Sequence, residues 1–115
     1  MKSFKYIPVI VLLFFYTQLM AAVDFMVGPS KEIVIAGDSS HEVTQAMVNA
    51  VRKRFLPNKV FLLGPDGEAD EEMLSLSPFL KFMGPINHRT TAYVCEQYTC
   101  REPVTEIEAL EAVLN

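Results

Sequence analysis

The order of apolar and polar positions along this chain predicts a small domain that mixes strands and helices. Residues 32–36 and 60–63 are short apolar runs that predict two buried strands, the first of them buried on both faces. Between them, apolar side chains recur at helical spacing and predict one buried helix face: Val43, Ala46, Met47, Ala50, Val51 and Phe55. This strand–helix–strand order predicts a parallel pair of strands joined by a right-handed crossover.

Turn and cap signals mark the ends of these elements. Ser39 and Glu42 stand three residues apart, which predicts a capping box for the first helix of the domain. Pro57-Asn58 is expected to end that helix. Asp70 is expected to cap a short acidic helix, and Pro78 prevents this helix from continuing.

The last third of the chain predicts one more strand and one more helix. Residues 91–96 have the composition of a strand, and Thr105 with Glu108 forms a second capping-box pattern. The final helix is expected to bury Ile107, Leu110, Val113 and Leu114. The predicted fold class is therefore α/β, with a small three-stranded, mostly parallel sheet and flanking helices in residues 28–115. One apolar helix in residues 1–27 precedes it.

The N-terminal segment fits a signal or anchor sequence in part. A short basic start that ends at Lys5 is followed by residues 6–23, which carry no charge, as in a signal peptide. Cleavage after Ala21 or Ala22 would place a large residue at the −3 position, which signal peptidase does not favour. As a membrane span the run is marginal, because a span needs about 20 apolar residues and Pro8 lies inside this one.

The same segment also fits a helix packed inside a larger protein. From Tyr16 onward the apolar residues fall at helical spacing: Leu19, Met20, Val23, Met26 and Val27. Gln18 and Asp24 are ordinary on a packed helix and unusual in contact with lipid. Gly28-Pro29 is expected to end the helix, with the glycine as its C-cap.

Composition narrows the classes of function. The chain has 115 residues, enough for one small domain, and a net charge of −4. General nucleic-acid binding needs a basic face, so we predict no nucleic-acid partner. The basic cluster at residues 52–54 is interpreted as a solvated helix end, where cations complement the helix dipole. No complete catalytic site, metal site or cofactor motif is visible, and we predict no cofactor.

Three residues are weak candidates for a ligand site. Asp38 follows the first predicted strand, at the end of the strand where α/β sheets bind ligands. The surrounding residues match neither a dinucleotide fingerprint nor a P-loop, so an ordinary turn is the simpler interpretation. His41, in the first turn of the next helix, and His88, in a loop, are expected to face solvent. A ligand site requires these three side chains to converge.

Both cysteines lie near the end of the chain. Cys95 and Cys100 have C-x4-C spacing, which differs from the C-x-x-C of thioredoxin-like redox sites. The simpler interpretation is two small, half-buried side chains. A disulfide between them is the alternative, and it requires a turn between the two residues.

Four segments together resemble one known family. Residues 16–25, 28–37, 54–60 and 91–105 are similar, in that order, to the late part of the spermatogenesis-associated protein 20 family, also described as thioredoxin-domain-containing proteins. Members of that family are several times longer. They carry an N-terminal thioredoxin-like domain with its own cysteine motif and then a helical toroid similar to those of six-hairpin sugar-processing enzymes. Residues 1–15 depart from the family pattern.

The resemblance implies that this chain is a C-terminal piece of such a protein. Cys95 and Cys100 would match the terminal C-x4-C of the family, so its redox function does not transfer to them. We therefore expect a non-catalytic module whose apolar helix packs on a toroid or on another partner protein, in the cytoplasm. The alternatives are a small secreted or membrane-anchored protein, held through residues 6–23 and carrying one disulfide, and a piece of a sugar- or nucleotide-binding cleft.

Overall fold

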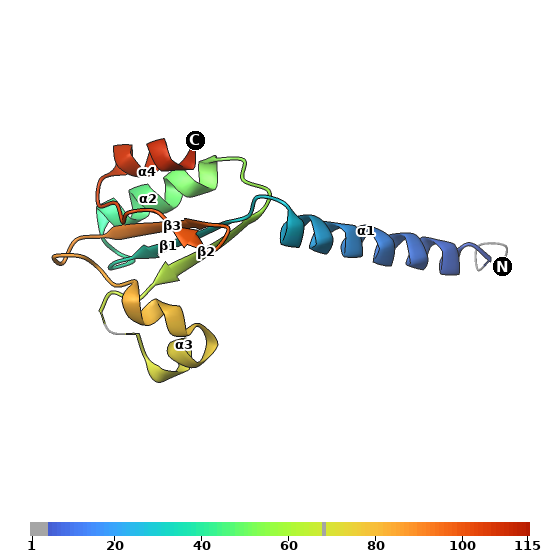
Figure 1. The fold of residues 1–115 in the computed structure, drawn as a ribbon, viewed down its shortest axis with the longest axis horizontal. Helices are drawn as coiled ribbons and strands as arrows, with labels where there is room; N and C mark the ends of the chain where they lie inside the picture. The colour runs from blue at the N-terminus through green and yellow to red at the C-terminus, as the bar shows by residue number, and fades with distance from the viewer. Residues whose placement is uncertain (1–4, 68) are drawn as a thin grey trace.

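The computed structural model describes residues 5–67 and 69–115, and it contains one sheet with helices on both faces and a long helix that extends away from it (Figure 1). The elements in chain order are α1 (Ile7–Val27), β1 (Lys31–Ala36), α2 (Glu42–Lys53), β2 (Lys59–Gly64), α3 (Glu71–Leu76), the 3-10 helix η2 (Pro78–Phe82), β3 (Thr91–Glu96), β4 (Thr99–Cys100) and α4 (Ile107–Leu114).

The sheet has four strands in the order β2-β1-β3-β4. The predicted α/β class and the parallel pairing of β1 with β2 are confirmed. The prediction of a three-stranded, mostly parallel sheet is wrong, because β3 runs antiparallel to β1 and pairs with the short strand β4 as an antiparallel hairpin. β4 is only two residues long, too short to produce an alternating pattern that the sequence could reveal.

One face of the sheet is covered by α2 and α4, which lie above it in Figure 1. The fully buried side chains of this layer come from the central strand and both helices: Ile33, Ile35, Met47, Val51 and Leu110. Burial of an aliphatic side chain of this size stabilises the fold by roughly 1.5–3 kcal/mol. This layer is therefore the principal core of the domain.

The opposite face packs on α3 and η2. Val34, Ala36 and Tyr93 from the sheet meet Leu80 from η2 in a second, smaller cluster. β1 thus buries alternate side chains on its two faces, as predicted. β2 does not, because it is an edge strand whose Val60 and Leu63 keep about 40% of their surface exposed. The strand predicted at residues 60–63 is confirmed, and the prediction that it is buried is wrong.

The observed helix ends confirm one sequence prediction and contradict three. Asp70 caps α3, its carboxylate accepting a hydrogen bond from the Met73 amide at 2.7 Å, as predicted. Both predicted capping boxes are wrong: α2 begins after His41, and α4 begins after Glu106, whose side chain makes no capping bond. Phe55 lies beyond the end of α2 and is 92% exposed, so it is not part of the buried helix face.

The helix α1 stands apart from the rest of the molecule. Helical spacing was visible only from Tyr16 onward, and α1 extends back to Ile7. Pro8 does not interrupt it, because it sits in the first turn, where proline is tolerated. It ends at Gly28 as expected, and the Asn58 amide donates a hydrogen bond to the Asp24 carboxylate at 2.9 Å near this end. None of its residues is buried. By length and composition α1 is one helix that could cross a membrane.

Candidate functional site

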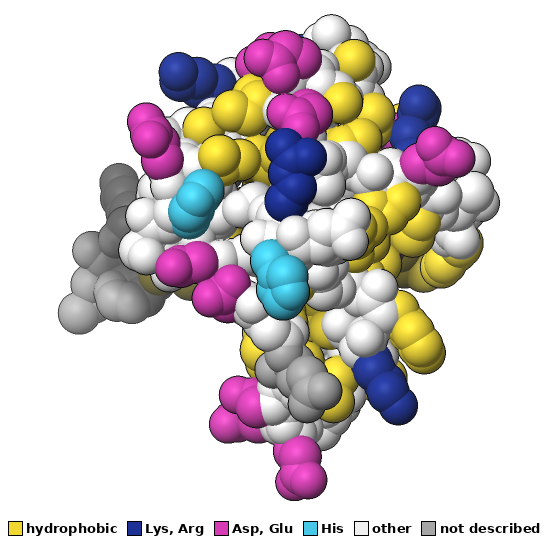
Figure 2. Space-filling view, turned by 90° about the vertical axis from the view of Figure 1, so that its left-hand side faces the viewer, with side chains coloured by type: hydrophobic (Ala, Val, Ile, Leu, Met, Phe, Trp, Pro, Cys, Tyr) yellow, Lys and Arg dark blue, Asp and Glu magenta, His cyan; other side chains and the backbone are white. Residues whose placement is uncertain are grey.

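A cleft of about 560 Å³ lies where β1 and β2 end, at the edge of the sheet where α/β proteins bind ligands. Asp38, His41 and His88 all line this cleft, although they come from two separate segments: the turn after β1 and the loop before β3. Figure 2 looks onto this end of the molecule and shows both histidines on one face, with acidic side chains between them. The full lining is Gly37, Asp38, His41, Val43, Asp66, Gly67, Gly84, Pro85, His88, Arg89, Thr90, Thr105 and Glu106.

Asp38 is held by the turn that follows β1. Its carboxylate accepts hydrogen bonds from the Ser40 hydroxyl at 2.7 Å and from the Ser40 amide at 2.8 Å. These bonds, with a smaller contribution from the nearby His41, lower the pKa of Asp38 below its ordinary value. A lowered pKa in the folded state means that the associated stability is present above the ordinary pKa and is lost as pH falls through the lowered one. Asp38 is therefore a charged acceptor at neutral pH.

His41 is the N-cap of α2, where the sequence pattern had placed Ser39. Its Nδ1 accepts a hydrogen bond from the Val43 amide at 3.3 Å. A nitrogen that accepts a hydrogen bond carries no proton, so the neutral ring has its proton on Nε2. The cap therefore leaves Nε2 as the donor of this exposed ring.

The loop that carries His88 is fixed by β3. Asn87 and His88 have φ angles of 52° and 58°, as in the two-residue hairpin turn that joins the bridged residues Ile86 and Arg89. The Thr91 hydroxyl accepts from the Ile86 amide at 2.9 Å and donates to the Arg89 carbonyl at 2.9 Å. These local bonds set the direction of the turn that carries His88 relative to β3.

The same wall of the cleft is anchored on the other face of the sheet. The Tyr93 hydroxyl donates a 2.6 Å hydrogen bond to the Gly84 carbonyl. Burial raises the pKa of Tyr93, so its hydroxyl remains protonated and able to donate across the ordinary pH range. The loop is thus fastened at both of its ends.

A buried contact between two hydroxyls lies behind Thr90 of the cleft lining, and it was not predicted from the sequence. The Thr44 and Thr90 hydroxyls lie 2.7 Å apart and join α2 to the loop before β3. Gly37 lies against them: a Cβ there would stand 2.8 Å from the Thr90 hydroxyl and 3.2 Å from the Thr90 Cα. Gly37 is therefore needed for close approach, and its position just after a buried strand was the available signal.

The charge of the cleft is predominantly negative. Asp38, Asp66 and Glu106 line it with one basic residue, Arg89, which pairs with Glu106 at 2.8 Å. Both partners of this pair are about 60% exposed, so the pair contributes little to stability. An excess of carboxylates disfavours a phosphate and favours a neutral or cationic ligand. In residues 5–67 and 69–115, no three His, Cys, Asp or Glu side chains are grouped to hold a metal ion.

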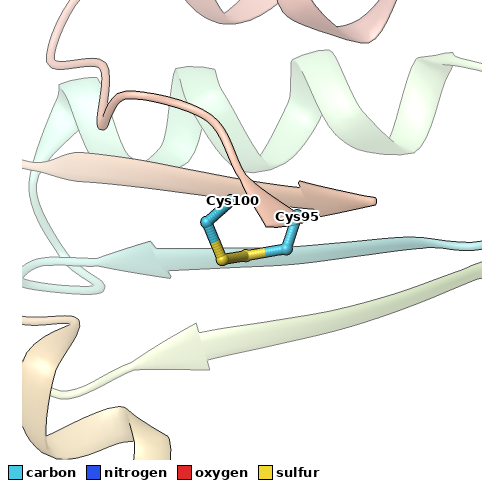
Figure 3. Close-up of a disulfide and its surroundings, with 2 residues drawn as sticks. All are labelled: Cys95 and Cys100. Atoms are coloured by element: carbon cyan, nitrogen blue, oxygen red, sulfur yellow. A yellow bond between two sulfur atoms is a disulfide. The ribbon is translucent and has the colours of Figure 1, made fainter. Parts of the chain in front are cut away.

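The two cysteines lie at the other end of β3, in the β3–β4 hairpin. Cys95 and Cys100 face each other across the hairpin, and their sulfurs are joined in the structure (Figure 3). Gln97 and Tyr98, with φ angles of 48° and 64°, make the intervening two-residue turn. The hairpin thus supplies the turn that a disulfide required. It also keeps both cysteines out of the cleft lining.

Comparison with known proteins supports the family resemblance. Over 85 residues, 74% of this chain, the sequence is 36% identical to spermatogenesis-associated protein 20 of Homo sapiens. The proteins of the same name from Rattus norvegicus and Mus musculus are 33% identical over the same share. This chain is homologous to a segment of spermatogenesis-associated protein 20. The matched segment is 11% of each of these relatives. No family model matches the chain, and no solved structure matches it.

The close approach at Gly37 predicts a position-specific cost. Gly37→Ala should destabilise the domain by about 1–3 kcal/mol, because the new methyl group overlaps Thr90 and separates it from Thr44. Urea unfolding of the full chain in detergent measures this change. Gly67→Ala is the matched control, since Gly67 lines the same cleft with nothing within 4 Å of an added Cβ. Equal effects of the two substitutions would contradict the assigned contact.

The hairpin geometry predicts a reducible cross-link. Reduction should raise the intact mass by about 2 Da and destabilise the domain by about 2 kcal/mol, the loop-closure contribution of so short a loop. Mass spectrometry and thermal melting with and without reductant measure both effects. The variant Cys95→Ser/Cys100→Ser should be insensitive to reductant. An unchanged mass after reduction of the native protein would show that the thiols are free.

Proposed function

We propose that residues 28–115 form a non-catalytic structural module of a larger protein and that α1 fastens this module to the remaining helices of that protein. The homology to one segment of a much longer relative supports a module of a larger protein. The single observation that carries the proposal is α1 itself, a 21-residue apolar helix with no buried residue. Such a surface in water is unstable and requires a partner.

The position of the exposed side chains limits how α1 can be covered. Large apolar residues point outward along its whole length, including Ile10, Phe14, Leu19 and Val23. A partner that contacts one side only would leave the others in water, so the helix must be enclosed. A helix that is apolar all round is typical of the interior of a large protein or of a membrane.

Polar groups within α1 favour enclosure by protein. The Thr17 hydroxyl is satisfied by the Phe14 carbonyl at 2.8 Å, but Gln18 has no hydrogen-bond partner among the described residues. A bilayer offers an amide no partner, and protein side chains or carbonyls do. The relevant partner in this proposal is the helical toroid of the family, and the chain would then be cytoplasmic.

Complementation tests this role of α1. We expect the full chain, coexpressed with human spermatogenesis-associated protein 20 that lacks the homologous segment, to purify with it as a soluble complex. Leu12→Glu/Leu19→Glu should abolish the complex, because two charges would be buried without partners. Tyr98→Glu, on the fully exposed hairpin tip, is the control and should leave the complex intact.

Membrane fractionation tests the alternative that α1 is a membrane anchor. If α1 packs on protein as proposed, alkaline carbonate should extract the chain from cell membranes. A chain that resists extraction, with α1 protected from protease, would instead identify a membrane anchor and would overturn the packing role of α1.

The cleft supports a second function, the binding of a neutral polyhydroxy ligand such as a sugar. The observation that favours it is the convergence of Asp38, His41 and His88 on one cleft. The charged Asp38 carboxylate can accept hydrogen bonds from hydroxyls, and a histidine N–H can donate to them. The excess of acidic residues makes a nucleotide polyphosphate the poorer candidate.

Ligand-detected NMR on the full chain in detergent tests this binding with a panel of neutral monosaccharides and with ATP. We expect saturation transfer to at least one sugar and none to ATP. Asp38→Asn should remove the signal while it retains an acceptor for Ser40 and therefore the turn. Glu111→Gln on the exposed side of α4 is the control. Transfer that persists in Asp38→Asn, or transfer to ATP alone, would contradict the assignment.

A further inference from the structure

The two edges of the sheet differ sharply in how they are covered. At the β4 side, the strand is only two residues long and is joined to β3 by the disulfide. The chain then returns along β3, where Ala92 and Val104 exchange two backbone hydrogen bonds of 2.8 and 3.0 Å. At the other side, no strand in residues 5–67 or 69–115 pairs with the outer edge of β2.

β2 lacks the features that protect an exposed strand edge. Natural edge strands are blunted by inward charges, prolines, bulges or very short length. β2 spans six residues, pairs in continuous register with β1 and has no charge after Lys59. Its Val60 and Leu63 are 40% and 41% exposed. The edge therefore presents both main-chain groups and apolar side chains to a partner strand.

An apolar groove of about 210 Å³ lies between the sheet and η2. Val60 and Leu62 of β2 line it together with Phe79 and Met83, and residues of β1 and β3 also line it. Phe79 is 44% exposed, and Phe82 in the same short helix is 80% exposed. A strand added at the β2 edge would pair its backbone and also lie next to Val60 and Leu62, at the β2 side of this groove.

We propose that a second copy of this chain occupies the edge, with β2 pairing antiparallel to β2 about a two-fold axis. Centred on Leu62, this register sets Phe61 opposite Leu63 of the other copy, and it sets Lys59 opposite Pro65, the neighbour of Asp66. Side chains alternate between the two faces along a strand, and residues that lie opposite each other point to the same face. Apolar side chains therefore meet apolar side chains on each face of the joined sheet. The contact is isologous and closes at two copies.

Charge complementarity favours this occupant and this direction. β2 begins at Lys59, and Asp66 follows its end. Antiparallel pairing brings the basic start of each strand near the acidic end of the other, at both ends of the contact. Parallel pairing would place like charges together, which is destabilising. The dimer also leaves α1 free. Each α1 precedes β1, so the two α1 helices leave the joined sheet at opposite ends. The inference is therefore independent of how α1 is covered.

The oligomeric state of the full chain in detergent micelles, measured by light scattering coupled to size exclusion, tests the proposal. We expect the mass of two chains for the native protein and of one chain for Val60→Lys/Leu63→Lys. Both positions are already partly exposed, so the variant should melt near the native temperature. Tyr98→Lys, on the opposite edge, is the matched control and should remain a dimer.

Two outcomes would overturn the dimer. One is a native protein with the mass of a single chain at its highest soluble concentration, which would leave the edge to a strand of another protein. The other is a dimer that survives Val60→Lys/Leu63→Lys and dissociates in Leu12→Glu/Leu19→Glu, which would place the contact on α1. Amide hydrogen exchange gives a readout without mutation: the β2 amides should become more protected as protein concentration rises, and unchanged protection would refute the pairing.

Discussion

The burial of β1 on both of its faces is the constraint on which this structure depends. This strand pairs with β2 on one side and β3 on the other, and it sends alternate side chains into two separate apolar clusters. Ile33 and Ile35 meet α2 and α4, and Val34 with Ala36 meets the layer of α3 and η2. Every other element of the domain is placed by its contact with this strand or with a neighbour of it.

The cleft is a consequence of that arrangement. β1 and β2 are parallel and end at the same edge, so the turns after them, which contain Asp38 and Asp66, lie together. The antiparallel strand β3 starts at this edge, which brings its preceding loop and His88 to the same place. Gly37 permits the close approach of that loop, and the Thr44–Thr90 contact holds it against α2.

Two apolar surfaces of the described structure are left uncovered by the domain: the outer edge of β2 and the helix α1. The sheet is closed at β4 by a cross-linked hairpin and a returning chain, and it is open at β2. An ion pair between Lys31 and Glu96 at 3.0 Å ties β1 to β3 near the closed end, and with Arg101 it lowers the pKa of Glu96. α1 contributes nothing to the core. An open strand edge and an uncovered apolar helix are typical of a domain that contacts other protein surfaces.

Local sequence determined the elements of this protein, because the spacing of apolar residues depends only on the geometry of a helix or a strand. Residues 32–36 and 43–51 were predicted from their apolar residues, and residues 91–96 from strand composition. The cap at Asp70 and the break at Pro78 were predicted from capping preference and from the chemistry of proline. The resemblance to the spermatogenesis-associated protein 20 family was likewise visible in four short segments, and the comparison supports it.

Only the tertiary structure decided how these elements meet. The antiparallel direction of β3, the two-residue strand β4 and the edge position of β2 depend on pairing between distant residues, and such pairing leaves no local period. The cap at His41 replaced Ser39 because the turn around Asp38 engages Ser40 instead. The convergence of Asp38, His41 and His88 required the strand directions to be known, since residues 38 and 88 are brought together by the sheet and not by the chain between them.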